Sequence, residues 1–517
     1  MKLWHKLALI CLAALILRAG LAAFVAHPGI ADPNHYYNLG RELTAGHGFQ
    51  IDYIWQFYAK PDAVVHPIDW WMPLTGVIAA GGMTLFGVSV HAALAPFVVL
   101  GALLPLLAYA ATRQLGGSEL AGLFAAAAVA VLPELVLNSV RTNTLIPNAL
   151  FVCGAIMLLV RGMRTGDPRT LAGSGLLAGL AYLTRSEAIL LLPMLVVTAA
   201  LYAIVRPSAL RAKPVTLLLP IVVAGIVVAP WLARNLHEFG WLTPPNQSQF
   251  AFWDDIREQY AYEPHFTWST LRASKSLSAI VAKRLFEMAA SVKLLYTGLD
   301  VFLPVPMIGG LLWLAARRDR DRLLTLAPTL ILLLGFFVFY TVINPYMSQG
   351  GSFKKAYLSL VPLLIPLGAI VMERAVPERR LLLGAMGLAL VLMTANAVEM
   401  VRADVRFTNT YVDDMRQVVA TVRTLPDTNG DGDIVLMNQD QFMLSFLGVK
   451  SVVIPFDDRD TVLEAAGRYG VDYLLMPPAR PSIDALYHGE EVDSRFVLAA
   501  TVPGTQYELY RFEPDQP

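Results

Sequence analysis

The sequence is poor in charged residues, poor in cysteine, and has no excess of either charge sign. Only 15% of its 517 residues are charged, Lys+Arg and Asp+Glu each number 40, and the formal net charge is zero. This balance gives no basic surface for nucleic acid. The two cysteines, Cys11 and Cys153, both lie in apolar runs, which argues against a disulfide scaffold or a cysteine zinc site. By contrast, 56% of the residues are hydrophobic and the mean hydropathy is +0.53, which excludes one soluble domain and predicts a polytopic membrane protein.

The apolar residues are concentrated in about eleven runs, each close to the roughly 20 residues that a membrane-spanning helix needs. Basic residues gather in the short linkers that alternate onto one side of the membrane, for example Arg161, Arg164 and Arg169. The positive-inside rule makes that side cytoplasmic. The N-terminus is then cytoplasmic, and the long loops 27–91 and 234–295 lie outside. The runs are residues 7–26, 92–112, 119–138, 144–160, 170–184, 187–205, 215–233, 296–315, 323–343, 357–372 and 381–400.

Beyond residue 402 the pattern changes to short apolar runs that alternate with helical stretches. This pattern predicts a small extracytoplasmic α/β domain over residues 403–517, beside an all-α membrane module over residues 1–402. Strands are expected at 434–437, 451–455, 471–476, 499–502 and 507–512, and helices at 412–425 and 461–469.

One segment of this domain resembles the opening of a calcium-binding loop. Asp427, Asn429, Asp431 and Asp433 place oxygen ligands at alternate positions, but Asn438 stands where the loop needs a bidentate Glu. A polar turn before a strand is therefore the favoured interpretation.

The first outer loop holds the residues best suited to chemistry. Asp32 lies a few residues beyond the first helix, where a carboxylate can act as a general base toward a hydroxyl. The alternative is that Asp32 only caps a helix that Pro33 starts. The same loop offers no compact cluster of metal ligands, so no cofactor is required and a divalent cation has only weak support. The other candidate site residues are His35, Tyr36, Tyr37, His66 and Asp69 in this loop, and Glu187 farther along the chain.

A few basic residues lie on the outer side, against the positive-inside trend. They are Arg141, Arg185, Arg234, Lys354 and Lys355. A guanidinium or ammonium group at this depth suits a phosphate held at the lipid surface. The alternative is that these side chains snorkel or pair with a nearby acid such as Glu187.

Taken in order along the whole chain, these residues resemble the GT-C superfamily of polyprenyl-phosphate-dependent glycosyltransferases. The likeness is greatest to the bacterial branch with the lipid A aminoarabinose transferases, the protein O-mannosyltransferases and the Rgt-type sugar transferases. The motifs that carry it are Arg18, Asp32, Tyr36, Tyr37, Leu39, Gly46 to Phe49, Leu85 to Gly87, Gly179 to Pro193, Pro230 to Gly240 and Lys355 to Pro366.

The resemblance implies an inverting glycosyltransferase in the bacterial cytoplasmic (inner) membrane. A hexosyl or pentosyl group would pass from a polyprenyl-phosphate donor to a hydroxyl of a glycan, lipid or protein acceptor, with Asp32 as the base. The residues expected at the phosphate, in some combination, are Arg141, Arg185, Arg234, Lys354, Lys355 and Tyr357.

The sequence departs from the family pattern at three places. Pro33 stands where many relatives have a second acid directly after Asp32. Pro147 and Asn148 stand where many carry Thr-Glu, and two lysines replace the arginine before a late helix. These departures concern the donor and the phosphate contacts rather than the base.

Two other classes of protein stay open, a lipid or polysaccharide transporter and a non-catalytic membrane partner of an envelope glycan complex. A transporter more often has two matching halves, and the sequence has no internal repeat. The observation that separates these classes is whether Asp32 and the outer cations meet at one site.

Overall fold

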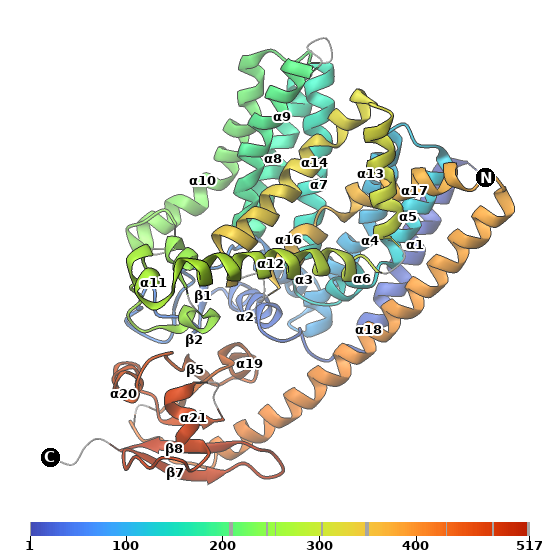
Figure 1. The fold of residues 1–517 in the computed structure, drawn as a ribbon. Coiled ribbons are helices and arrows are strands. Elements are labelled where there is room, and N and C mark those ends of the chain that lie inside the picture. Colours follow the sequence, from blue (N-terminus) through green and yellow to red (C-terminus); the bar gives the residue numbers. More distant parts are fainter. Residues whose placement is uncertain are drawn as a thin grey trace.

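The computed structural model describes residues 2–205, 210–243, 247–253, 255–300, 303–346, 351–430, 432–477 and 480–513. Figure 1 shows a bundle of helices above a small region of strands and short helices, joined by one long diagonal helix, α18 (Arg379–Val422). With 44 residues, α18 has a length of about 66 Å at 1.5 Å per residue. It continues through residue 402, where the sequence predicted a domain boundary, and that division of the chain stays a prediction.

Among the described residues, seven helices are long and apolar enough to cross a membrane, or up to nine if each of two bent pairs is one span. The seven are α1 (Leu3–Ala22), α4 (Val90–Gln114), α7 (Leu145–Thr165), α9 with η1 (Ser186–Val205), α10 with η3 (Pro214–Phe239), α14 with η6 (Arg320–Ile343) and α18. The bent pairs are α5 (Glu119–Val131) with α6 (Pro133–Ser139), and α16 (Ser352–Leu358) with α17 (Val361–Ala375). A multi-pass membrane protein is thus confirmed.

The predicted count of eleven spans is neither reached nor excluded, because two of the predicted runs fall on shorter helices. Run 170–184 is α8 (Pro168–Thr184), which has 17 residues. Run 296–315 is not one helix, which corrects the prediction: α12 (Leu277–Thr297) ends inside it, and α13 begins only at Pro304 (Pro304–Ala316). An apolar run alone does not show where a chain turns between two helices.

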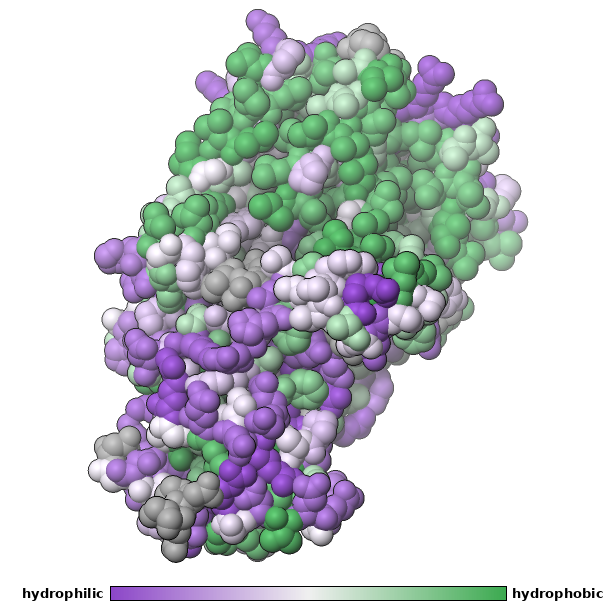
Figure 2. Space-filling view, turned by 60° about the vertical axis from the view of Figure 1, so that its left-hand side comes forward, coloured by the Kyte–Doolittle hydropathy of each residue, from purple (hydrophilic) through white to green (hydrophobic). Residues whose placement is uncertain are grey.

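The surface of the molecule divides in the same way as its fold. Figure 2 shows hydrophobic side chains covering the helical bundle and hydrophilic side chains covering the lower part. Large apolar side chains such as Ile16, Ile204 and Leu312 are exposed on the bundle. Exposed apolar surface of this extent is typical of a face that contacts lipid.

The bend between α5 and α6 is stabilised by the buried Arg18 of α1. The two helices meet at an angle of 52°, where Pro133 has no N–H group to continue the helical hydrogen bonds. The guanidinium of Arg18 donates to the carbonyl of Ala130 at 2.6 Å and to Oγ of Ser139 at 3.0 Å. This side chain therefore satisfies polar groups on both sides of the bend. Helix α6 begins immediately after the bend, with Pro133 and Glu134.

The lower region is built on a six-stranded sheet with the order β2-β5-β4-β6-β8-β7. The predicted strands are confirmed as β4 (Val435–Asn438), β5 (Lys450–Val453), β6 (Tyr473–Met476), β7 (Phe496–Thr501) and β8 (Glu508–Phe512). Strands β4, β5 and β6 are parallel, and β7 and β8 form the expected antiparallel hairpin. The short helices of the region are α19 (Gln441–Phe446), α20 (Arg459–Arg468) and α21 (Pro481–Tyr487).

One edge of this sheet comes from the first outer loop. Strand β2 (Tyr53–Ile54) pairs in parallel with β5, so that Tyr53 lies beside Ser451. The loop also contains α2 (Asp32–Thr44), α3 (Leu74–Phe86) and an antiparallel pair, β1 (Gln50–Ile51) with β3 (His66–Pro67). The second outer loop forms short helices, η4 (Gln247–Phe252), η5 (Ile256–Tyr260) and α11 (Trp268–Ser274).

The calcium-like segment forms a turn around the Asp427 side chain. Its carboxylate oxygens accept backbone N–H groups of Asn429 at 3.0 Å, Gly430 at 2.7 Å and Gly432 at 2.7 Å. Asp431 lies outside the described residues. Three backbone donors on one carboxylate are the contacts of a polar turn, which is the arrangement that the sequence favoured.

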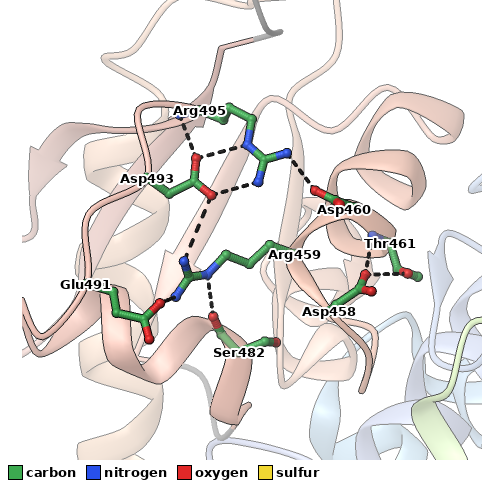
Figure 3. Close-up of polar contacts among 8 residues, drawn as sticks. All are labelled: Asp458, Arg459, Asp460, Thr461, Ser482, Glu491, Asp493 and Arg495. Carbon is green, nitrogen blue, oxygen red and sulfur yellow. Dashed lines mark hydrogen bonds and ion pairs between the residues drawn. The ribbon is translucent and has the colours of Figure 1, made fainter.

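An ion-pair network ties the short helices of the lower region to its hairpin (Figure 3). Arg495 contacts Asp493 and Asp460 at 2.8 and 2.6 Å. Arg459 contacts Glu491 at 2.6 Å and Asp493 at 4.0 Å. We call these five residues the tail network.

Candidate active site

Asp32 is the first residue of α2, and its side chain does not cap that helix. The preceding Ala31 has a φ of 59°, in a region that residues with a Cβ rarely adopt. The helix has no side-chain cap hydrogen bond. Instead, Nζ of Lys355 donates to Oδ2 of Asp32 at 2.5 Å. The capping alternative is therefore not realised, and Asp32 faces a cation from a helix near the other end of the membrane module.

A second ion pair is formed by the lysine that precedes Lys355 in the sequence. Lys354, the neighbour of Lys355 on α16, contacts Oε1 of Glu134 at 2.5 Å. Glu134 is at the start of α6, just after the bend that Arg18 stabilises. Its side chain is 10% exposed, that of Lys354 is 35% exposed, and those of Asp32 and Lys355 are both partly exposed. We call Asp32, Glu134, Lys354 and Lys355 the twin ion pairs.

Arg185, Glu187 and Tyr36 surround the Asp32 end of the twin ion pairs. The guanidinium of Arg185 pairs with Glu187 and donates to Oγ1 of Thr144 at 2.9 Å. Burial alone would raise the pKa of Asp32, but the charge of Lys355, with smaller effects of Arg185 and His35, brings it below its ordinary value of 3.8. Asp32 is therefore ionised at neutral pH, as a general base must be.

The two polar rings that follow Asp32 on α2 are both uncharged at neutral pH. Burial raises the pKa of Tyr36 well above its ordinary value, and the negative charge of Asp32 adds to the shift. Burial lowers the pKa of His35 to about 3 against the opposing effect of Asp32. The His35 Nδ1 shares a hydrogen bond of 2.5 Å with Oη of Tyr53, and its ring lies against Trp71. These residues form an uncharged wall beside the carboxylate.

Helix α2 is held in place by the C-terminal region. Nδ2 of Asn38 donates to the carbonyl of Phe442 at 3.0 Å, and Arg41 donates to the carbonyl of Ser445 at 3.1 Å. Both acceptors lie on α19, next to the strand that pairs with β2. The sheet region and the proposed base are thus connected through one buried helix contact.

Several residues predicted for the site have other partners. Arg234 donates to the carbonyls of Ile68 at 2.6 Å and Phe49 at 3.2 Å, so it organises the first outer loop. Arg141 pairs with Asp404 on α18, and burial lowers its pKa to about 10 against the opposing effect of Glu134. The remaining contacts are Tyr357 Oη to the Leu294 carbonyl at 2.6 Å, Tyr37 against Phe446, and His66 Nδ1 to the Val64 carbonyl at 2.9 Å.

Asp69 is buried away from the twin ion pairs. Burial raises its pKa, and the largest opposing effect comes from His66. Across the described ranges, no three His, Cys, Asp or Glu side chains gather as metal ligands would. That no cofactor is required stays an untested prediction.

Glu134 is a functional candidate that was not predicted from the sequence. It lies inside the predicted span 119–138, where an ionisable side chain is expensive and is by default a sign of function. That signal was available in the sequence. Its partner was not, because Lys354 is 220 positions further along the chain.

One family model matches part of the sequence. Residues 65–233, which are 169 of the 517, match the model described as dolichyl-phosphate-mannose-protein mannosyltransferase. No protein with a curated function matches the sequence.

Solved structures match over nearly the whole chain. ArnT from Cupriavidus metallidurans bound to undecaprenyl phosphate is 14% identical, with a TM-score of 0.63 and coverage of 97% of each chain. The oligosaccharyltransferase of Archaeoglobus fulgidus, tethered with an acceptor peptide, is 13% identical with a TM-score of 0.59. That match covers 92% of this chain and 69% of the other. At these identities the likeness establishes the fold.

Proposed function

Since the chain has the fold of the GT-C superfamily, as its sequence resemblance predicted, we propose that it is an inverting glycosyltransferase with a polyprenyl-phosphate sugar as donor. The family-model match and the fold together support a lipid-linked donor in general. The acceptor is a hydroxyl group of a glycan, lipid or protein. Transfer takes place at the outer face of the cytoplasmic membrane, the side on which the basic linkers do not lie.

The observation that carries this proposal is the contact between Asp32 and Lys355. A base and a phosphate-binding cation must lie close together, because one takes a proton while the other holds the leaving group. The two residues are 323 positions apart in sequence, and their side chains meet at 2.5 Å. Both are partly exposed, so substrates can reach them.

In the proposed reaction, the donor phosphate first takes Lys355 from Asp32. The acceptor oxygen then attacks the anomeric carbon from the face opposite the phosphate, and its proton passes to Asp32. The bond between the anomeric carbon and the phosphate oxygen breaks, and its electron pair stays on the phosphate. The positive charges of Lys355, Lys354 and Arg185 stabilise that developing charge.

The test is transfer of radiolabelled sugar by purified protein in lipid, with membrane extract as the source of acceptor. We expect Asp32→Asn to lower the transfer rate by about 10²–10⁴-fold, which is the usual contribution of a general base. Asp493→Asn is the matched control, because it removes an ion-paired carboxylate from the tail network. Unchanged transfer by folded Asp32→Asn protein would contradict the assignment.

A further inference from the structure

We propose that Glu134 competes with the lipid phosphate for Lys354 and so promotes release of the polyprenyl-phosphate product. This inference rests on the proposed function and adds to it the step that follows transfer. Its basis is the geometry of the twin ion pairs, in which two adjacent lysines each contact a carboxylate from a different element.

Glu134 needs an opposite charge beside it. A carboxylate that is 10% exposed, in a helix of the membrane module, is costly unless it has an opposite charge beside it. Lys354 provides that charge at 2.5 Å. When no phosphate is bound, each carboxylate also reduces the repulsion between the adjacent ammonium groups.

Lys354 can still bind a further anion. An ammonium has three N–H donors, and the structure gives Lys354 one carboxylate partner among the described residues. Its side chain is 35% exposed. Lys354 can therefore turn from Glu134 toward an incoming phosphate, just as Lys355 can turn from Asp32.

The two pairs differ once transfer is complete. Asp32 has taken the acceptor's proton, so it is neutral and no longer attracts Lys355. The leaving group has changed from a phosphodiester to a phosphomonoester, which carries about 1.5–2 negative charges at pH 7. Both lysines therefore hold the product more strongly than they held the donor. Glu134 takes no proton in the reaction, and its carboxylate can attract Lys354 back and release the phosphate.

The test is direct binding of undecaprenyl phosphate to the full-length protein in lipid nanodiscs. Glu134→Gln keeps the shape of the side chain and removes its charge, so we expect this variant to bind the probe about tenfold more tightly. Lys354→Gln should bind it about tenfold more weakly. The double variant should bind like Lys354→Gln alone, because Glu134 acts through Lys354.

Turnover gives a second readout that a purely structural role would not reproduce. In the Glu134→Gln variant, steady-state kcat should fall because product release is slower, while the rate of a single turnover should not fall. Glu119→Gln is the matched control, since Glu119 pairs with Lys6 at 2.6 Å at the other end of the same bent helix pair. That variant should bind the probe as the wild type does. If Glu134→Gln does not fold, Glu134→Asp shortens the same side chain and should tighten binding by a smaller factor.

Unchanged or weaker binding by folded Glu134→Gln would overturn the inference and leave the proposed transfer reaction standing. Absence of probe binding to the wild type would overturn it as well. Tighter binding by Glu134→Gln in a protein that transfers no sugar would instead support the competition at Lys354 and count against the proposed function. The two proposals can therefore fail separately.

Discussion

The twin ion pairs and the tail network are both groups of opposite charges, but they are built differently. In the tail network, each arginine contacts more than one acid, and all five members lie between residues 459 and 495. Two of its acids are largely exposed, Asp460 at 79% and Glu491 at 60%. In the twin ion pairs, each lysine contacts one acid, and the four residues come from three distant parts of the chain.

This difference indicates two roles. The tail network stabilises the surface of the lower region, whereas the lysines of the twin ion pairs can exchange one partner for another. Exposed ion pairs usually contribute between zero and about 1 kcal/mol each, and arginines whose donors are shared among several acids have little left for a ligand. A lysine with one carboxylate has donors to spare. The twin ion pairs are therefore the group suited to bind and release a phosphate.

Of the substitutions that test this difference between the two groups, Lys355→Met is expected to have the largest effect on the rate of transfer. Loss of one group that stabilises charge in a transition state typically lowers the rate by about 10²–10³-fold. The variant should also change the pH dependence of transfer. Asp32 must be ionised to accept a proton, so activity is lost as the pH falls through its pKa.

In the wild type that loss lies below the ordinary value of 3.8, because Lys355, Arg185 and His35 together outweigh the effect of burial on the pKa of Asp32. Without Lys355, burial acts with less opposition and raises the pKa of Asp32, so the acid limb should move to higher pH. The pH dependence of kcat/KM gives this limb, because it reports the ionisation of the free enzyme, in which Lys355 still contacts Asp32. An acid limb at the same pH in both proteins would contradict the role of Lys355.

An intermediate effect on transfer is expected from Asn38→Leu. This substitution tests a second contact between distant parts of the chain, the one that holds the helix carrying Asp32. The variant removes the hydrogen bond to the Phe442 carbonyl and leaves a buried acceptor unsatisfied, at a cost of about 1–3 kcal/mol. Because α2 carries Asp32, a looser helix should lower kcat by about tenfold with little change in KM. Thr44→Val is the control, since its hydroxyl bonds to Gly40 within the same helix. Equal losses in both variants would show that the contact to α19 has no special effect.

The smallest effect is expected from Arg495→Gln in the tail network. The variant removes contacts with Asp493 and Asp460. At about 0–1 kcal/mol for each surface ion pair, we expect a loss of at most about 2 kcal/mol in the free energy of unfolding. Thermal unfolding measures that loss, and sugar transfer should be unchanged. A large loss of transfer would show that the tail network takes part in the reaction and would contradict the difference between it and the twin ion pairs.

The sequence was most informative where the pattern was local. The five strands of the lower region follow from short apolar runs between turn residues, and each was predicted within a few positions. Arg185 and the two lysines were selected as site candidates from the sequence, because outer-side cations oppose a general trend. Local pattern failed at 296–315, where two helices share one apolar run.

Contacts between distant residues could not be predicted in the same way. Strand β2 has two residues, too few for any periodicity, and it is defined by its pairing with β5. Arg234 looked like a phosphate ligand, but it holds the loop carbonyls of Ile68 and Phe49. A residue type suggests what a side chain can bind, and only the fold determines which partner is near.

The strand pairing between the first outer loop and the C-terminal sheet also sets the order of events during biosynthesis. Tyr53 pairs beside Ser451, which is made 398 residues later. At about 5–20 residues per second, the loop waits about 20–80 s for its partner. Lys355 is made 323 residues after Asp32, and Phe442 of α19 is made 404 residues after Asn38 of α2. A chain made only as far as Lys355 therefore has both partners of this ion pair but still lacks the α19 contacts that hold α2.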